Sequence, residues 1–101
     1  KYRTKFLDRV FSKKEQKYCQ SKSKPSIHFA GRFAAKEAVI KSIKSSGYAQ
    51  PIEFNSIKIM NNPDGSPSVE LDLPFKGNVK VSISHTDTYA IAFALSELNR
   101  K

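Results

Sequence analysis

The sequence predicts an α+β protein in which one long helix packs on a small antiparallel sheet. Apolar residues recur at helical spacing in the first half of the chain, and two-residue alternation fills the second half. Helices followed by a run of strands are typical of the α+β class. The 101 residues fit one domain over positions 1–101, and no internal repeat divides them.

Two short helices are expected at the start of the chain. Residues 6–11 are apolar at positions 6, 7, 10 and 11, which is helical spacing. Ser12 and Glu15 then have the arrangement of a capping box, in which an N-cap hydroxyl is answered by a carboxylate three residues on. This pair should begin a second helix that ends near Cys19.

The main helix is expected over residues 27–45, with Ser26 as its N-cap and Gly47 just beyond its end. On a helical wheel one sector is apolar and contains Phe29, Phe33, Ile40 and Ile43. Beside it lies a row of small residues, Ala30, Ala34 and Ala38. The seam between the two carries Glu37, Lys41 and Lys44. Charges at a seam are neither fully solvated nor in the core, so a functional site is expected there.

Four strands are expected after residue 50. Residues 55–60 carry Ile57 and Ile59 on one face, and a dense turn signal follows at residues 61–67. Three further segments alternate between larger apolar residues and polar or small ones: residues 69–73, 79–83 and 89–95. Such alternation indicates strands with one face on a core.

The charge of the chain is large and uneven. The net charge is +9, and the segment from Lys1 to Lys24 holds nine of the 18 basic residues but only two acids, Asp8 and Glu15. This asymmetry predicts an acidic partner. The single cysteine, Cys19, excludes an internal disulfide and fits a reducing cytoplasm. No apolar run has the length of a membrane span, and no signal-peptide pattern is present.

Two constellations could carry chemistry. Glu37 and Lys41 lie one helical turn apart, so they form either a surface ion pair or a place where a divalent metal and a phosphate bind side by side. The segment 82–87 ends a strand with hydroxyls, His85 and an acid, which suits phosphate binding, proton transfer or a simple polar turn. One cysteine and two scattered histidines do not have the spacing of a zinc site.

These motifs resemble those of a known family. Residues 29–38 with Lys41, followed by 81–86 and 89–93, are similar to the small bacterial holo-[acyl carrier protein] synthases, which are 4′-phosphopantetheinyl transferases. Residues 9–12 with Glu15, and the Asp-Gly-x-Pro turn at 64–67, extend the resemblance over most of the chain. It implies transfer of 4′-phosphopantetheine from coenzyme A to a serine of apo acyl carrier protein, as in fatty acid biosynthesis.

The resemblance also implies roles for particular residues. Glu37 would hold Mg²⁺ or Mn²⁺ and accept the serine proton, and Lys41 would hold phosphate oxygens. The coenzyme A contacts implied by the family are Arg32, Lys36, Lys41, His85 and Thr86. The basic N-terminal segment would dock the acidic carrier protein, and family members are usually trimers with active sites between subunits.

One family feature has no counterpart in this sequence. The family begins with a strand of the type Gly-Ile-Gly-x-Asp whose Asp is the second metal ligand, and we expect that ligand upstream of Lys1. Two other functions stay open from the residues alone. One is a small basic nucleic-acid-binding module, which the aromatic residues Tyr2, Tyr18 and Tyr48 would serve. The other is a catalytically dead relative that binds carrier protein. The resemblance favours the transferase, with neither nucleic acid nor membrane as a partner.

Overall fold

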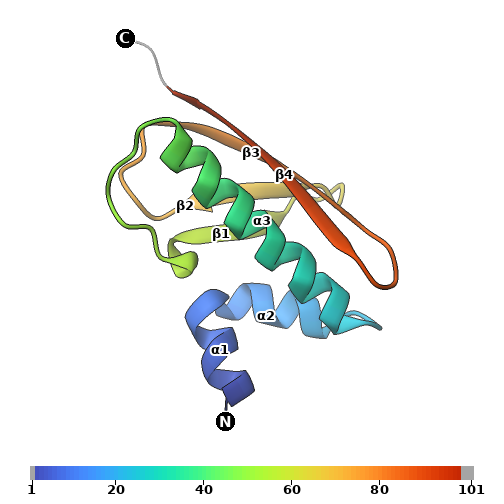
Figure 1. The fold of residues 1–101 in the computed structure, drawn as a ribbon. Helices are drawn as coiled ribbons and strands as arrows, with labels where there is room; N and C mark the ends of the chain where they lie inside the picture. Colours follow the sequence, from blue (N-terminus) through green and yellow to red (C-terminus); the bar gives the residue numbers. More distant parts are fainter. Residues whose placement is uncertain (1, 99–101) are drawn as a thin grey trace.

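The computed structural model describes residues 2–98 and confirms the α+β class (Figure 1). Three helices come first: α1 (Tyr2–Val10), α2 (Lys13–Gln20) and α3 (Pro25–Ser45). A short 3₁₀ turn, η1 (Phe54–Ser56), leads into the strands β1 (Ile57–Asn61), β2 (Pro67–Leu71), β3 (Gly77–His85) and β4 (Ala90–Leu98). The long helix α3 crosses the strands, and α1 and α2 lie together at its N-terminal end.

The four strands form two hairpins rather than the one small sheet that was predicted. β1 pairs antiparallel with β2, and β3 pairs antiparallel with β4, with each pair forming a separate two-stranded sheet. The segment between β2 and β3 contains Pro74, which has no N–H to donate to a ladder. The hairpins still pack side by side, because β2 contacts β3 and α3 contacts both β1 and β4.

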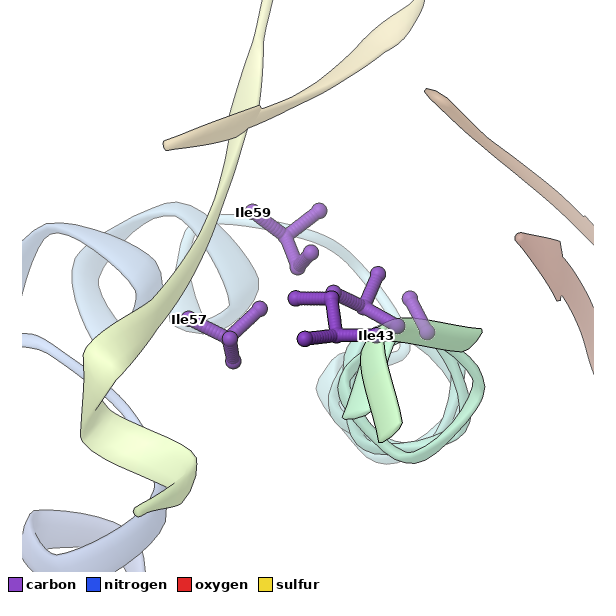
Figure 2. Packing of buried hydrophobic residues seen from close by; sticks show 5 residues of the cluster. Ile43, Ile57 and Ile59 are labelled. Atoms are coloured by element: carbon purple, nitrogen blue, oxygen red, sulfur yellow. The ribbon is translucent and has the colours of Figure 1, made fainter. Parts of the chain in front are cut away.

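The core lies between α3 and β1. Ala35, Val39 and Ile43 of α3 are fully buried against Ile57 and Ile59 of β1 (Figure 2). Ile57 and Ile59 point from the strand toward Ile43. Burying one such side chain stabilises the fold by about 1.5–3 kcal/mol. The face predicted for β1 is therefore confirmed.

The start of α3 and its buried face differ from the prediction. The helix begins at Pro25, with Lys24 rather than Ser26 as its N-cap, because proline fits the first helical position and needs no hydrogen bond there. Its buried residues are Gly31, Arg32, Ala35, Lys36, Val39 and Ile43. Phe29, Phe33 and Ile40 of the predicted apolar sector are only partly buried. The ring of Phe33 instead stacks on the ring of Phe54, with 5.2 Å between the ring centres.

The other side of α3 packs closely on the β3–β4 hairpin. A Cβ at Gly31 would lie 3.1 Å from a methyl of Ile83, so a larger residue at this position would require the Ile83 side chain to shift slightly. Ser42 Oγ donates to Ser96 Oγ over 2.7 Å. The alternation of β4 predicted that one of its faces packs on a core. In the structure the face that does so carries the small residues, and Ala92 and Ala94 pack against the core cluster.

The large side chains of β4 point away from the protein. Tyr89, just before the strand, and Ile91, Phe93 and Leu95 within it are 62–73% exposed. This outer face is defined as the β4 apolar row. Within residues 2–98, no helix combines the length and the apolar composition that crossing a bilayer requires.

Candidate functional site

Glu37 and Lys41 lie on the exposed side of α3, away from the core. The ion pairs of residues 2–98 do not include this pair, so the interpretation as a surface ion pair is not supported. Lys41 lines an open hollow of about 530 Å³ between α3 and β4. The hydroxyls of Ser42 and Ser45 and the ring of Phe93 line it as well. The Lys41 ammonium and the Ser45 hydroxyl are donors that suit phosphate oxygens, whereas the Ser42 hydroxyl already donates its proton to Ser96.

Glu37 has the chemistry of one ligand in a hard-cation site. Within residues 2–98, its carboxylate makes no ion pair, and no three His, Cys, Asp or Glu side chains group as a metal site. Mg²⁺ accepts such an incomplete protein shell, because it keeps several waters and binds through one or two carboxylates plus substrate phosphates. The donors present therefore fit a shared metal–phosphate site rather than a closed protein cage.

Arg32 lies in the interior rather than on the surface. It is 5% exposed, and its Nη2 donates to Asn61 Oδ1 at the end of β1. Its guanidinium lies 4.2 Å from the ring centre of Tyr18 on α2, an arrangement of the cation–π type. The Nε of Arg32 is buried with no hydrogen-bond partner among the described residues. Arg32 lines a pocket of about 220 Å³ together with Tyr18, Lys14 and Asn61.

His85 is the last residue of β3, and Thr86 begins the turn that leads to β4. Thr86 N donates to Tyr89 O over 2.8 Å, and Thr86 Oγ1 accepts from the backbone N of Thr88 and of Tyr89. The segment therefore forms a hydrogen-bonded polar turn, and His85 is exposed at the end of β3. The Thr86 hydroxyl accepts within the turn and keeps its proton to donate.

Two residues outside the predicted site join its parts. The His85 ring packs edge-on against His28 of α3, with ring centres 5.2 Å apart. His28 packs in turn on Tyr18, 6.1 Å away and nearly perpendicular. Burial and the nearby His85, Lys22 and Arg32 hold the pKa of His28 below its usual value of 6.5. Sequence reasoning missed these contacts because aromatic residues at 18, 28 and 85 show no periodic relation.

Lys36 requires a correction. The family resemblance placed it against the nucleotide, but its side chain is fully buried. Its Nζ donates to Glu15 Oε1 at 2.8 Å and also to the backbone oxygens of Val10 and Phe54. The other Glu15 oxygen accepts from Ile59 N at 2.7 Å. All three ammonium protons thus serve the fold, and Lys36 is left out of the ligand site.

The buried pair also affects titration. Burial lowers the pKa of Lys36, and the hydrogen bond and charge of Glu15 oppose that shift. Glu15 closes the predicted capping box at the same time, since its carboxylate accepts from Ser12 N and Ser12 Oγ accepts from Glu15 N. One carboxylate therefore joins α2, α3 and β1.

The basic segment of the sequence forms the surface of α1 and α2. Of its two acids, Glu15 is buried, and Asp8 accepts hydrogen bonds from Gln16 and Lys13 that lower its pKa. The exposed basic side chains of these helices include Lys5, Arg9, Lys13, Lys14 and Lys17. This set is defined as the basic face, and it presents almost uncompensated positive charge.

The fold and these clusters define a small α+β protein whose exposed carboxylate and grouped donors suit a phosphate-bearing ligand. The chain belongs to the 4′-phosphopantetheinyl transferase superfamily, whose sequence profile matches residues 1–94. It is 43% identical over 100 residues to the holo-[acyl-carrier-protein] synthase of Protochlamydia amoebophila, which covers 94% of this chain and 81% of that protein. The family resemblance seen in the motifs is confirmed.

Two solved structures share the fold. The complex of Chronobacterium ammoniagenes ACPS with coenzyme A has a TM-score of 0.79 and 29% identity, covering 93% of this chain and 81% of that one. The holo-[acyl-carrier-protein] synthase of Helicobacter pylori in complex with coenzyme A has a TM-score of 0.76 and 31% identity, covering 95% and 84%.

Proposed function

We propose that this protein is a holo-[acyl carrier protein] synthase that transfers 4′-phosphopantetheine from coenzyme A to a serine of apo acyl carrier protein. The observation that carries the proposal is membership in the transferase superfamily over residues 1–94, with Glu37 and Lys41 exposed side by side on α3. The second product is adenosine 3′,5′-bisphosphate, and the holo carrier protein then serves fatty acid biosynthesis.

In the reaction, the serine oxygen of the carrier forms a bond to the phosphorus that bears the pantetheine arm, and the bond from that phosphorus to the bridging pyrophosphate oxygen breaks. The nucleophile belongs to the carrier protein. The lone thiol of this chain, Cys19, is buried, and burial raises its pKa to about 11, so no thiolate forms at neutral pH.

Glu37 is proposed to accept the serine proton, directly or through a water. General-base assistance of this kind contributes roughly 10²–10⁴-fold to a rate. The same carboxylate would hold Mg²⁺ or Mn²⁺, which when bound supplies neutralisation of the pyrophosphate charge.

The coenzyme is proposed to contact two places on the protein. Lys41, on the wall of the hollow between α3 and β4, holds phosphate oxygens and the leaving group. Arg32, His85 and Thr86 bind the nucleotide end with its 3′-phosphate. Their support is that the described geometry brings Arg32 and His85 into one cluster through Tyr18 and His28.

The basic face is proposed to dock the acidic carrier protein. Its positive charge steers an acidic partner and speeds encounter. An open, largely apolar hollow of about 470 Å³, lined by Phe6, Leu7 and Phe29 among others, lies between α1 and the start of α3. Apolar side chains of an acidic helix would pack there while its carboxylates pair with lysines.

The protein is further proposed to assemble as a homotrimer through the β4 apolar row. The row presents four large, exposed side chains side by side on one face, and contiguous apolar surface of this kind marks interaction sites. Because Phe93 belongs to the row and also lines the Lys41 hollow, association would place a neighbouring subunit at the active site.

The test is mass spectrometry of apo acyl carrier protein incubated with this protein, coenzyme A and Mg²⁺. We expect the carrier to gain the mass of one phosphopantetheine arm. Glu37→Ala should slow that gain at least about 100-fold, since it removes the base and the metal ligand. Glu53→Ala removes another exposed carboxylate and should leave the rate unchanged.

The mass assay, together with binding assays for the carrier and for RNA, separates the alternatives. A carrier that binds the protein but gains no mass would identify a non-catalytic carrier-binding relative. Retention of single-stranded RNA at physiological salt without carrier modification would favour the nucleic-acid-binding module.

A further inference from the structure

We propose that Tyr18 and His28 are positioning residues that set the spacing between Arg32 and His85 and so tune recognition of the 3′-phosphate of coenzyme A. The inference rests on the proposed function, because it deepens the role given there to Arg32 and His85. It concerns two residues that the reaction itself does not use.

The first support is a continuous row of side-chain contacts across three elements. His85 of β3 contacts His28 of α3, His28 contacts Tyr18 of α2, and Tyr18 contacts the Arg32 guanidinium. The successive separations are 5.2, 6.1 and 4.2 Å between ring centres or between ring centre and Arg32 Cζ. The rings of Tyr18 and His28 meet edge to face, which is a favoured aromatic geometry.

The second support is that few other contacts hold the His85 side chain in place. His85 is exposed at the end of a two-stranded hairpin, and among the described residues its ring nitrogen contacts only the neighbouring Thr86 carbonyl, at 3.3 Å. Lys24, at the start of α3, forms an ion pair with Asp87 of the hairpin tip at 3.4 Å. These side chains are 63% and 85% exposed, and exposed pairs hold little. The ring contact with His28 is therefore the firmer tie.

The third support is the charge around the row. Lys22 lies 4.6 Å from the Tyr18 ring centre, and Arg32 lies on the same ring, so His28 stands among cations. Those neighbours and its burial favour the neutral imidazole, as its lowered pKa indicates. A neutral ring can pack between Tyr18 and His85 without adding repulsion. His28 thus acts by packing and leaves the phosphate contact to Arg32 and His85.

Arg32 is poised for such a contact. Its Nε is buried with no hydrogen-bond partner in the described part of the chain, while Nη2 is held by Asn61. A guanidinium fixed by Tyr18 on one side and Asn61 on the other is pre-organised, so less freedom is lost when an anion binds. Removing Tyr18 or His28 would loosen one end of the pair without removing a phosphate ligand.

The experiment compares coenzyme A with dephospho-coenzyme A, which lacks the 3′-phosphate but carries the same transferable arm. KM and kcat are measured for both substrates with the parent protein, His28→Ala, His28→Phe and Tyr18→Leu. We expect His28→Ala and Tyr18→Leu to raise KM for coenzyme A about five- to tenfold, the scale of one aromatic contact. KM for dephospho-coenzyme A and both kcat values should stay within about twofold.

The conservative and control variants make the result specific. His28→Phe keeps a ring edge against Tyr18 and should keep most of the parent KM. Asp87→Asn removes the exposed ion pair at the same hairpin tip and should leave KM within about twofold. Melting temperatures identify a variant that fails to fold, and His28→Leu, which keeps bulk but no ring, then replaces His28→Ala.

Each outcome has one meaning. Equal KM changes for the two substrates, or no change for either, would overturn the positioning role while leaving the transferase intact. Asp87→Asn matching His28→Ala would overturn it too, since any loosening of the tip would then suffice. Absence of transfer from both substrates by the parent protein would instead defeat the proposed function.

Discussion

The two β-hairpins use the same alternating pattern for opposite purposes. In β1 the large side chains face inward, and Ile57 and Ile59 are 0% and 1% exposed. In β4 the large side chains face outward, and Phe93 is 69% exposed while Ala92 and Ala94 pack toward α3. Both strands belong to antiparallel pairs of matched register.

The difference shows how α3 divides the molecule. One side of the helix has the large residues Val39 and Ile43, which complete the core with β1. Its other side lies so close to β3 that even a Cβ at Gly31 would crowd Ile83. On this side β3 turns Val79, Val81 and Ile83 toward the core, whereas β4 turns only the small residues Ala92 and Ala94 inward, so its large residues face away. The first hairpin completes the core, and the second leaves a row of large apolar side chains exposed.

The largest predicted effect comes from breaking the buried Glu15–Lys36 ion pair, which joins the helices to β1. Glu15→Gln leaves the Lys36 ammonium in the core without its counter-charge, and both side chains are 0% exposed. Loss of one partner from a buried pair costs about 3–5 kcal/mol, so the free energy of unfolding in urea should fall by that amount.

Two comparisons check the cause of that loss. The double variant Glu15→Gln/Lys36→Met should recover a large part of the stability, because no isolated charge remains. Lys13→Ala, which removes an exposed pair with Asp8, should cost less than about 1 kcal/mol. A Glu15→Gln loss no larger than that of Lys13→Ala would contradict the role of the buried pair.

An intermediate effect separates the two hairpins directly. Phe93→Ser should convert the proposed trimer to monomer in sedimentation velocity, and it should change the unfolding free energy of the dilute monomer by less than about 1 kcal/mol. Ile59→Ala, on the buried strand, should instead cost about 2–5 kcal/mol at any protein concentration. Unchanged association of Phe93→Ser would remove the β4 apolar row as the interface.

The smallest predicted effect is the pH dependence of stability that comes from His28, which lies on α3 against His85 of the second hairpin. Because the pKa of His28 is lowered from 6.5 in the folded protein, the unfolded chain binds more protons in the window just below that value. Stability from this group is therefore complete above pH 6.5 and is lost as pH falls through 6.5 toward the folded pKa. The melting temperature of the parent should fall more between about pH 7.5 and 5.5 than that of His28→Phe. Parallel pH profiles for the two proteins would refute this.

Much of the local structure was predictable, because short-range physics determines it. The capping box of Ser12 and Glu15 uses groups three residues apart, and the structure has it as expected. Gly47 ends α3 with a positive φ of 107°, which glycine adopts without strain. The β1 face follows from period two alone. The start of α3 was misplaced because Pro25 at the first turn outweighed Ser26 as a cap.

The candidate site was predictable in part. Glu37 and Lys41 share one face of α3 because four residues make about one turn. The burial of Lys36 was not predictable, since its partner Glu15 lies 21 residues away on another helix. A lysine in an apolar stretch is expected at the surface unless such a partner is known.

By itself, the sequence determined the α+β class, the helices, the alternating strands, the basic N-terminal segment and the family to which the motifs belong. These depend on residues near one another or on composition. Tertiary structure alone decided that Lys36 is buried, that the large face of β4 points outward and that Tyr18 and His28 join Arg32 to His85. Each of these depends on contacts between distant segments, whose distance and direction are set only when α3 packs against both hairpins.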